Sequence, residues 1–120
     1  MTDQLPKVIQ DSHKLILWLI PLLDQFPRSR RFTLGERLES GLLDVLADLV
    51  DAAYNKQKRP ALLRASRQLE ITRHLWRITF ELKIIPPKRY QHGAQLIDQI
   101  GRQIGGWLRQ AQGYNNETSK

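Results

Sequence analysis

The 120-residue sequence contains no cysteine, a single methionine and no long run of apolar residues. Without cysteine there is no disulfide scaffold, no thiolate metal ligand and no cysteine nucleophile. The longest apolar stretch, residues 15–23, is interrupted by Pro21 and is far shorter than the roughly 20 residues of a membrane-spanning helix. Residues 1–11 carry acidic side chains and no small-residue cleavage site, so we expect no signal peptide. We therefore expect a single cytoplasmic domain that does not bind a membrane.

Histidine is also scarce, and its three copies lie far apart in the sequence. His13, His74 and His92 form no H-E-x-x-H motif and no cluster with carboxylates, so we expect no metal, no cofactor and no catalytic site. One pair nevertheless resembles an enzymatic motif: Arg67 and His74 match the R-x6-H pattern of HEPN-type ribonucleases. In such a pair the histidine moves a proton and the arginine stabilises the phosphorane. The match is two residues wide in an arginine-rich chain, which makes a ribonuclease the weakest of three functional hypotheses.

Acidic residues are almost absent from the second half of the chain. The whole sequence has a net charge of +7, but residues 1–55 contain six Lys or Arg and eight Asp or Glu, a net of −2. Residues 56–109 contain twelve Lys or Arg and three acids, a net of +9. Such an asymmetry predicts a polyanionic partner, most often nucleic acid.

The apolar residues recur at spacings of three and four with no sustained alternation, which predicts helices throughout. We expect four helices, over residues 6–26, 33–54, 60–84, and 87 to 108 or 110. Thr33 and Glu36 match a capping box, in which the Thr33 hydroxyl accepts a hydrogen bond from the Glu36 amide at the start of the second helix. The three connections are short, so sequential helices should be antiparallel neighbours. The predicted fold is all-α, an up-down-up-down antiparallel four-helix bundle over residues 1–110, followed by a polar, flexible tail over residues 111–120.

One face of each predicted helix is apolar, as a single shared core requires. On the first helix this face consists of Val8, Ser12, Leu15, Leu19, Leu22, Leu23 and Phe26. The second and third helices each carry another apolar line on a different side. Together with two residues of the first helix, these additional lines comprise Leu17, Trp18, Leu43, Ala47, Val50, Tyr54, Ile71, Leu75, Ile78 and Leu82. They are either buried between helices of one chain or covered by another subunit. We favour the second interpretation and predict a homo-oligomer, because monomers rarely expose such patches.

Three glycines lie near one face of the fourth predicted helix. Gly93, Gly101 and Gly105 each cost about 1 kcal/mol relative to alanine in a helix interior. A glycine loop that cradles phosphate needs a preceding strand, which this sequence does not predict. We therefore expect these glycines to permit close approach between helices.

The basic residues gather at the predicted loops and along two helices. Those we predict to bind nucleic acid are Arg28, Arg30, Arg31, Lys58, Arg59, Arg64, Arg67, Arg73, Arg77, Lys83, Lys88 and Arg89. In an antiparallel bundle the first and third loops share one end, so the arginines of residues 28–31 should approach Lys83, Lys88 and Arg89. The planar guanidinium group of arginine can donate two parallel hydrogen bonds to the oxygens of a phosphate. The sequence shows no RNP signature, helix-turn-helix or zinc finger, so we expect salt-sensitive contacts to the backbone of RNA or DNA rather than base-specific readout.

Two segments carry a family resemblance: FPRSRRFTLGER at residues 26–37 and IGRQIGGW at residues 100–107. Over residues 13–108 the chain resembles the Avd family, the accessory variability determinants of diversity-generating retroelements. The resemblance implies a non-catalytic, basic, barrel-like homopentamer that binds the retroelement's reverse transcriptase and nucleic acid, the template RNA included. It also implies a role in adenine-directed mutagenic reverse transcription, which diversifies a target gene.

A wider group of four-helix bundles offers the alternative. That group includes the proteins encoded in ribosomal RNA intervening sequences, and it implies a generic structured-RNA-binding bundle with no polymerase partner. The three hypotheses are thus an accessory subunit of a reverse transcriptase, a generic RNA-binding bundle and a ribonuclease.

Overall fold

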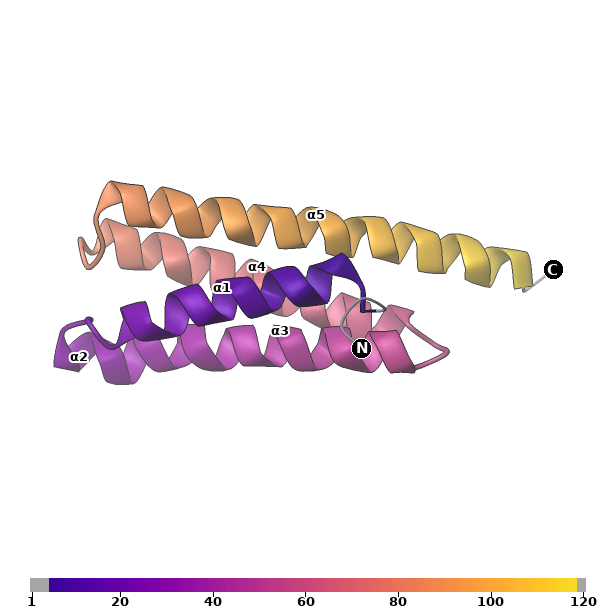
Figure 1. Cartoon of the computed structure of the whole chain (residues 1–120), viewed down its shortest axis with the longest axis horizontal. Helices are drawn as coiled ribbons and strands as arrows, with labels where there is room; N and C mark the ends of the chain where they lie inside the picture. The colour runs from indigo at the N-terminus through magenta and orange to yellow at the C-terminus, as the bar shows by residue number, and fades with distance from the viewer. Residues whose placement is uncertain (1–4, 119–120) are drawn as a thin grey trace.

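The computed structural model describes residues 5–118, and the side chains of residues 5–111. Four long helices form an antiparallel bundle: α1 (Lys7–Leu23), α3 (Glu36–Tyr54), α4 (Arg59–Glu81) and α5 (Pro87–Thr118) (Figure 1). A short helix α2 (Arg28–Arg30) and a π-helical turn η2 (Arg31–Gly35) lead directly into α3. The part of the chain described contains no strand, which confirms the predicted all-α bundle.

Each long helix packs against two others and buries one face between them. Helix α3 contacts α1 and α4, while α5 contacts α4 and α1. The predicted core face of α1 is confirmed, because all seven of its residues are buried. At the centre, the Trp76 side chain is 1% exposed, and its indole N–H donates a hydrogen bond to the Tyr90 carbonyl oxygen at 2.9 Å. The core therefore follows from helical periodicity, as the sequence predicts.

The second helix does not begin at the predicted capping box. Helical backbone starts at Arg28 and runs without interruption through η2 into α3. The Glu36 amide already donates to the Arg31 and Thr33 carbonyls, so it has no need of a side-chain cap. The Thr33 hydroxyl instead donates to the carbonyls of Ser29 and Arg30, at 3.2 and 3.3 Å. A threonine inside a helix usually donates its hydroxyl hydrogen bond to a carbonyl of the preceding turn in this way, so the capping-box prediction is wrong.

The last helix is longer than predicted. Helix α5 continues past residue 110 to Thr118, through the segment that we expected to be a flexible tail. Residues 111–118 contain no proline and a single glycine, Gly113, so nothing in their backbone chemistry stops a helix. Residues 1–4 of the predicted bundle domain and residues 119–120 of the predicted tail lie outside the described residues.

Candidate nucleic-acid interface

Two acidic residues of the first half of the chain meet an arginine of the second half across the α3–α4 contact. Arg64 on α4 forms ion pairs with Asp48 at 3.2 Å and Asp51 at 3.1 Å, both on α3. The charge asymmetry seen along the sequence is therefore partly cancelled in space. Exposed pairs of this kind stabilise a fold by only about 0–1 kcal/mol, yet they still reduce the positive field that a polyanion would meet.

Two further arginines of α4 are also paired. Arg73 contacts Glu70 of its own helix at 3.1 Å and forms an ion pair with Asp98 of α5. Arg77 pairs with Glu81 at 2.9 Å. Together with Arg64, these side chains were predicted to bind nucleic acid, but each already holds an acidic partner. Arg67 and Arg59 lie on the exposed surface of the same helix.

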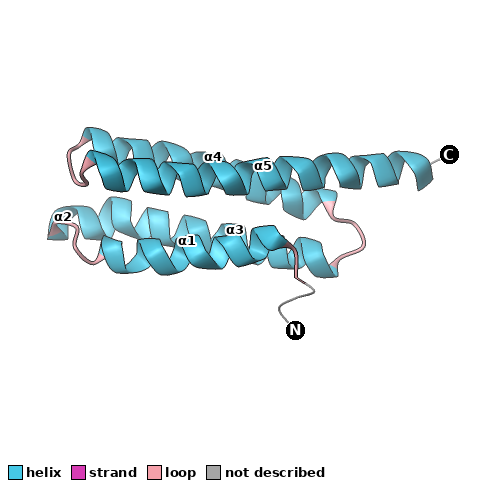
Figure 2. Ribbon diagram, turned by 45° about the horizontal axis from the view of Figure 1, so that its top comes forward, coloured by secondary structure: helices cyan, strands magenta, loops and turns pink. Residues whose placement is uncertain are grey.

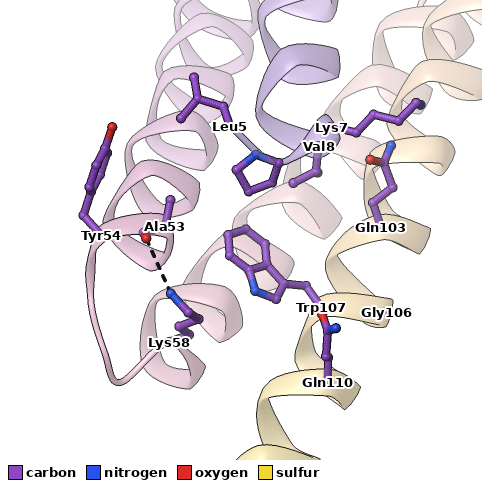
Figure 3. Close-up of a pocket in the computed structure, with 11 residues that line it drawn as sticks. Leu5, Lys7, Val8, Ala53, Tyr54, Lys58, Gln103, Gly106, Trp107 and Gln110 are labelled. Atoms are coloured by element: carbon purple, nitrogen blue, oxygen red, sulfur yellow. Dashed lines mark hydrogen bonds between the residues drawn. The ribbon is translucent and has the colours of Figure 1, made fainter. Parts of the chain in front are cut away.

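Lys58 is a structural residue rather than a surface cation. Its ammonium group donates to the Ala52 carbonyl at 2.8 Å and to the Asn55 carbonyl at 3.0 Å, where α3 ends. Those carbonyls would otherwise lack partners, and a cation is favoured beside them. The same group lies 5.9 Å from the centre of the Trp107 ring, in an open groove of about 760 Å³ (Figure 3). The binding of nucleic acid by Lys58 stays a prediction, although its ammonium group already has these internal partners.

Arg31 is likewise held inside the fold. Its guanidinium group contacts Asp24 at 3.4 Å and Glu39 at 3.3 Å, and its side chain is 24% exposed. The side chain crosses over the buried Gly35, where an added Cβ would lie 3.2 Å from Arg31 Nη1. Arg31 thus ties the α1–α2 loop to α3, and its place in the nucleic-acid interface stays a prediction.

Five of the predicted cations gather at one end of the bundle, which we call the basic end: Arg28, Arg30, Lys83, Lys88 and Arg89. The α1–α2 loop and the α4–α5 turn lie at this same end, on the left in Figures 1 and 2. A hydrogen bond of 3.1 Å from Arg89 to the Gln25 side chain links the two connections. All five basic side chains are exposed, and among the described residues Arg28 and Arg30 form no ion pair. The expected approach of the first and third loops is thus present, while the role of these residues stays a prediction.

The sequence reasoning missed two features of the basic end. Phe32, in η2, is 60% exposed beside the arginines. The available signal was the aromatic residue in the string R-S-R-R-F, which we had not counted among the binding residues. Lys83 has a φ of 61°, a left-handed conformation that favours glycine. No sequence signal marks that conformation, because lysine is rare there.

The additional apolar lines are exposed in the single chain. Leu43 on α3 and Ile78 on α4 are each 44% exposed, and Val50, Tyr54, Ile71, Leu82 and Leu17 are exposed as well. Ala47 is also exposed and Leu75 is half-buried. Trp18 differs from the others because its ring packs edge-on against Trp76, with ring centres 6.0 Å apart. Trp18 is therefore better explained as part of the bundle interior, and the interface role of the other residues stays a prediction.

The predicted close packing by glycines is present at two positions of three. A Cβ on Gly93 would lie 2.7 Å from the Trp76 ring, and one on Gly101 would lie 3.1 Å from Arg73 Nη2 of α4. Gly105 has no such neighbour, because the nearest atom to an added Cβ belongs to Arg109 of its own helix, at 3.6 Å. The prediction is therefore wrong for Gly105.

The histidines stand apart from one another. His74 is exposed on the outer surface of α4, 3.6 Å from Glu70, and Arg67 is exposed on the same helix. The His92 ring packs edge-on against Trp18. Within residues 5–111, whose side chains the structure describes, no three histidine or acidic side chains lie where they could hold a metal ion. The same stretch contains no helix that is long and apolar enough to cross a membrane.

Fold and surface together define a small all-helical bundle with one cationic end and apolar lines on its flank. The sequence model of a family described as bAvd-like matches residues 7–111. The chain therefore belongs to the bAvd-like family, which is a family of accessory proteins rather than of catalysts. At the level of the family, this membership supports an accessory role in a diversity-generating retroelement. A search of curated proteins found no match.

Proposed function

We propose that this protein is a non-catalytic accessory subunit that binds the reverse transcriptase of a diversity-generating retroelement together with nucleic acid, either template RNA or its DNA copy. Family membership supports the retroelement role. The observation that carries the nucleic-acid part is the basic end, where Arg28 and Arg30 have no ion-pair partner among the described residues. Forked guanidinium groups without an internal partner are available to phosphates.

The proposal includes assembly of several copies. The exposed lines on α3 and α4 would be covered in a homo-oligomer, which the resemblance to Avd proteins suggests is a pentamer. Assembly would place several basic ends on one particle, and linked sites bind a long polyanion much more tightly than a single site does.

Salt-dependent RNA binding tests the basic end. The double variant Arg28→Ala/Arg30→Ala should weaken binding across RNA sequences and reduce the slope of log K against log salt by about one for each lost phosphate contact. Fluorescence anisotropy with labelled RNA at several salt concentrations measures both quantities. Arg77→Ala is the comparison, because that arginine is paired with Glu81, so its loss should reduce the slope less than the double variant does. An unchanged affinity in the double variant at moderate salt would remove this end from the interface.

Co-purification separates the accessory subunit from a generic RNA-binding bundle. A reverse transcriptase from the same retroelement should remain bound after nuclease treatment if the two proteins contact each other directly. A complex that is lost on nuclease treatment would instead show that RNA bridges them. Purified protein should leave RNA intact, and cleavage that His74→Ala abolishes would replace this proposal with the ribonuclease hypothesis.

A further inference from the structure

The basic end carries one large aromatic side chain that the bundle leaves in solvent. The Phe32 side chain is 60% exposed, and among the described residues it stacks on no other aromatic ring. Arg28 precedes it by four residues and Arg30 by two in the same continuous helical segment, and both arginine side chains are exposed. An exposed ring thus lies within four residues of two guanidinium groups that have no ion-pair partner among the described residues.

The backbone holds this ring in a fixed position. Phe32 belongs to the π-helical turn η2, which is continuous with helix on both sides. Arg31 anchors the turn through Asp24 and Glu39, and the Thr33 hydroxyl bonds back to the preceding carbonyls. Phe32 therefore lies on an ordered element, and a π turn inside a helix is a feature that often marks functional positions.

The π turn also separates Phe32 from the apolar line on α3. With uninterrupted α-helical spacing, Phe32 would lie three turns before Leu43 and would extend that line. Phe32 lies inside the π turn, whose wider spacing of residues per turn breaks the α-helical register between Phe32 and the line on α3. Phe32 therefore does not continue that line.

An aromatic ring beside unpaired arginines fits one kind of polyanion best. Cations alone attract any phosphate backbone, and a duplex keeps its base faces stacked inside. A single strand exposes base faces, which stack on aromatic side chains while nearby cations follow the phosphates. We infer that the basic end binds single-stranded nucleic acid, with an unpaired base stacked on Phe32 and adjacent phosphates held by Arg28 and Arg30. This inference rests on the proposed nucleic-acid function. It adds that the ligand is single-stranded and that Phe32 distinguishes single strands from duplexes.

The test compares single strands with duplexes. Full-length Phe32→Ala protein is titrated against a labelled oligouridine, an oligothymidine and an RNA duplex of equal length. We expect affinity for both single strands to fall by about 5- to 100-fold, with the salt slope unchanged, because stacking involves no charge. Affinity for the duplex should change by less than about twofold, since its bases are not available to stack. Loss on RNA but not on DNA would show that the 2′-hydroxyl, rather than stacking, is recognised and would overturn the inference.

Matched variants isolate the aromatic face. Phe32→Leu keeps an apolar side chain without a ring and should behave like Phe32→Ala. Phe32→Trp should bind at least as tightly as the unmodified protein, and its fluorescence should be quenched on addition of the single strand. Leu63→Ala removes another exposed apolar side chain, on α4, and should leave binding unchanged.

The outcomes distinguish this inference from the proposed function. If the unmodified protein binds no oligonucleotide, the nucleic-acid part of the proposed function fails together with the inference. If the unmodified protein binds oligonucleotides but Phe32→Ala changes the affinity for none of them, only the inference fails. The same conclusion holds if Phe32→Ala lowers the affinity for the duplex as much as that for single strands. Loss of the reverse transcriptase from Phe32→Ala protein, with single-strand binding intact, would make Phe32 a protein contact and would also overturn the inference.

Discussion

At the scale of single residues, Lys83 places a cation of the proposed interface in a backbone conformation that lowers stability. Helix α4 ends with the Ile84 amide bonded to the Thr79 carbonyl at 3.1 Å and the Lys83 amide bonded to the Phe80 carbonyl at 2.9 Å. This pattern puts Lys83 in the left-handed conformation that glycine usually occupies. A side chain there costs about 1–2 kcal/mol. The exposed Lys83 side chain adds one cation to the basic end.

Replacing that lysine should separate stability from binding. We expect Lys83→Gly to raise the free energy of unfolding by about 1 kcal/mol, because the left-handed conformation no longer strains a side chain. The same variant should bind RNA more weakly, since the basic end loses one cation. Urea unfolding and anisotropy measure the two effects. Lys88→Gly is the control: it removes the same charge from ordinary helix in α5 and should give no gain in stability.

Two glycines of α5 should respond to alanine in opposite ways. A Cβ on Gly93 would lie 2.7 Å from the buried Trp76 ring, which has no free space to move into. Gly93→Ala should therefore destabilise the protein by about 1–3 kcal/mol. At Gly106 the nearest atom to an added Cβ is Arg109 Nη2 at 3.8 Å, so Gly106→Ala should stabilise the helix by roughly 0.5–1 kcal/mol. Thermal or urea unfolding measures the change in stability of each variant. Equal changes in the two variants would contradict the close packing of Gly93 against Trp76.

At the scale of helices, a carboxylate joins α1 to α5. Asp11 on α1 accepts hydrogen bonds from Lys7 of its own helix and from Gln103 of α5, both at 2.8 Å. The hydrogen bond from the Lys7 ammonium group is the main cause that lowers the pKa of Asp11 below its ordinary value. Gln103 adds to this effect, and partial burial opposes it. Two donors therefore favour the charged form in the folded protein.

This arrangement predicts a loss of stability in acid. The pKa of Asp11 is lower in the folded than in the unfolded chain. The stabilisation that the ionised carboxylate gives to the folded protein is therefore fully present above the pKa of the unfolded chain, about 3.9. The contribution is lost as the pH falls through the folded pKa. Asp11→Asn should thus be less stable than the unmodified protein near neutral pH, and the difference should shrink in acid. Urea unfolding across a pH series measures this difference in the free energy of unfolding. Gln103→Ala should reduce the difference in part, and a pH-independent difference would contradict the assignment.

At the scale of the whole molecule, the apolar lines on α3 and α4 predict assembly. In the single chain they expose side chains such as Leu43 and Ile78, both 44% exposed, along two neighbouring helices. Sedimentation or light scattering at micromolar concentration should give a mass that is a multiple of 14.0 kDa. Ile78→Asp should dissociate the assembly, because a buried unpaired charge is strongly unfavourable. Leu63 is on the same helix but outside the lines, so Leu63→Asp should leave the assembly intact. A 14.0 kDa species for the unmodified protein would refute the assembly.

Assembly also bears on how the basic end acts. The charge of this protein is not spread evenly, since several arginines of α4 are paired with acids from α3, α4 and α5. Five exposed cations gather at the end that joins Arg28 and Arg30 to the α4–α5 turn, while others, such as Arg67 and Arg102, lie exposed along the helices. A monomer therefore presents a small cationic surface, whereas an oligomer would present several on one particle.

The sequence by itself determined the helices, their order and the face that each one buries. Leu15 and Leu19 are buried because a period of 3.6 residues places them on one side of α1, and no long-range information is needed to see that. Family membership could likewise be read from local segments, and the comparison over residues 7–111 confirms it. The start of the second helix was misjudged because the Glu36 amide bonds to a backbone carbonyl that a local motif does not reveal.

Only the tertiary structure decided which cations remain for a partner. Arg64 and Asp48 are sixteen residues apart, and Arg31 meets Asp24 and Glu39 only after the chain turns between α1 and α3. Ion pairing depends on distances of a few ångströms between helices, and spacing along the chain does not fix these distances. The same holds for the π turn that exposes Phe32 and for the left-handed Lys83, because both depend on how neighbouring backbone groups are hydrogen-bonded. Periodicity sets what each helix buries, but contacts between helices set which of the remaining charges and rings can reach a ligand.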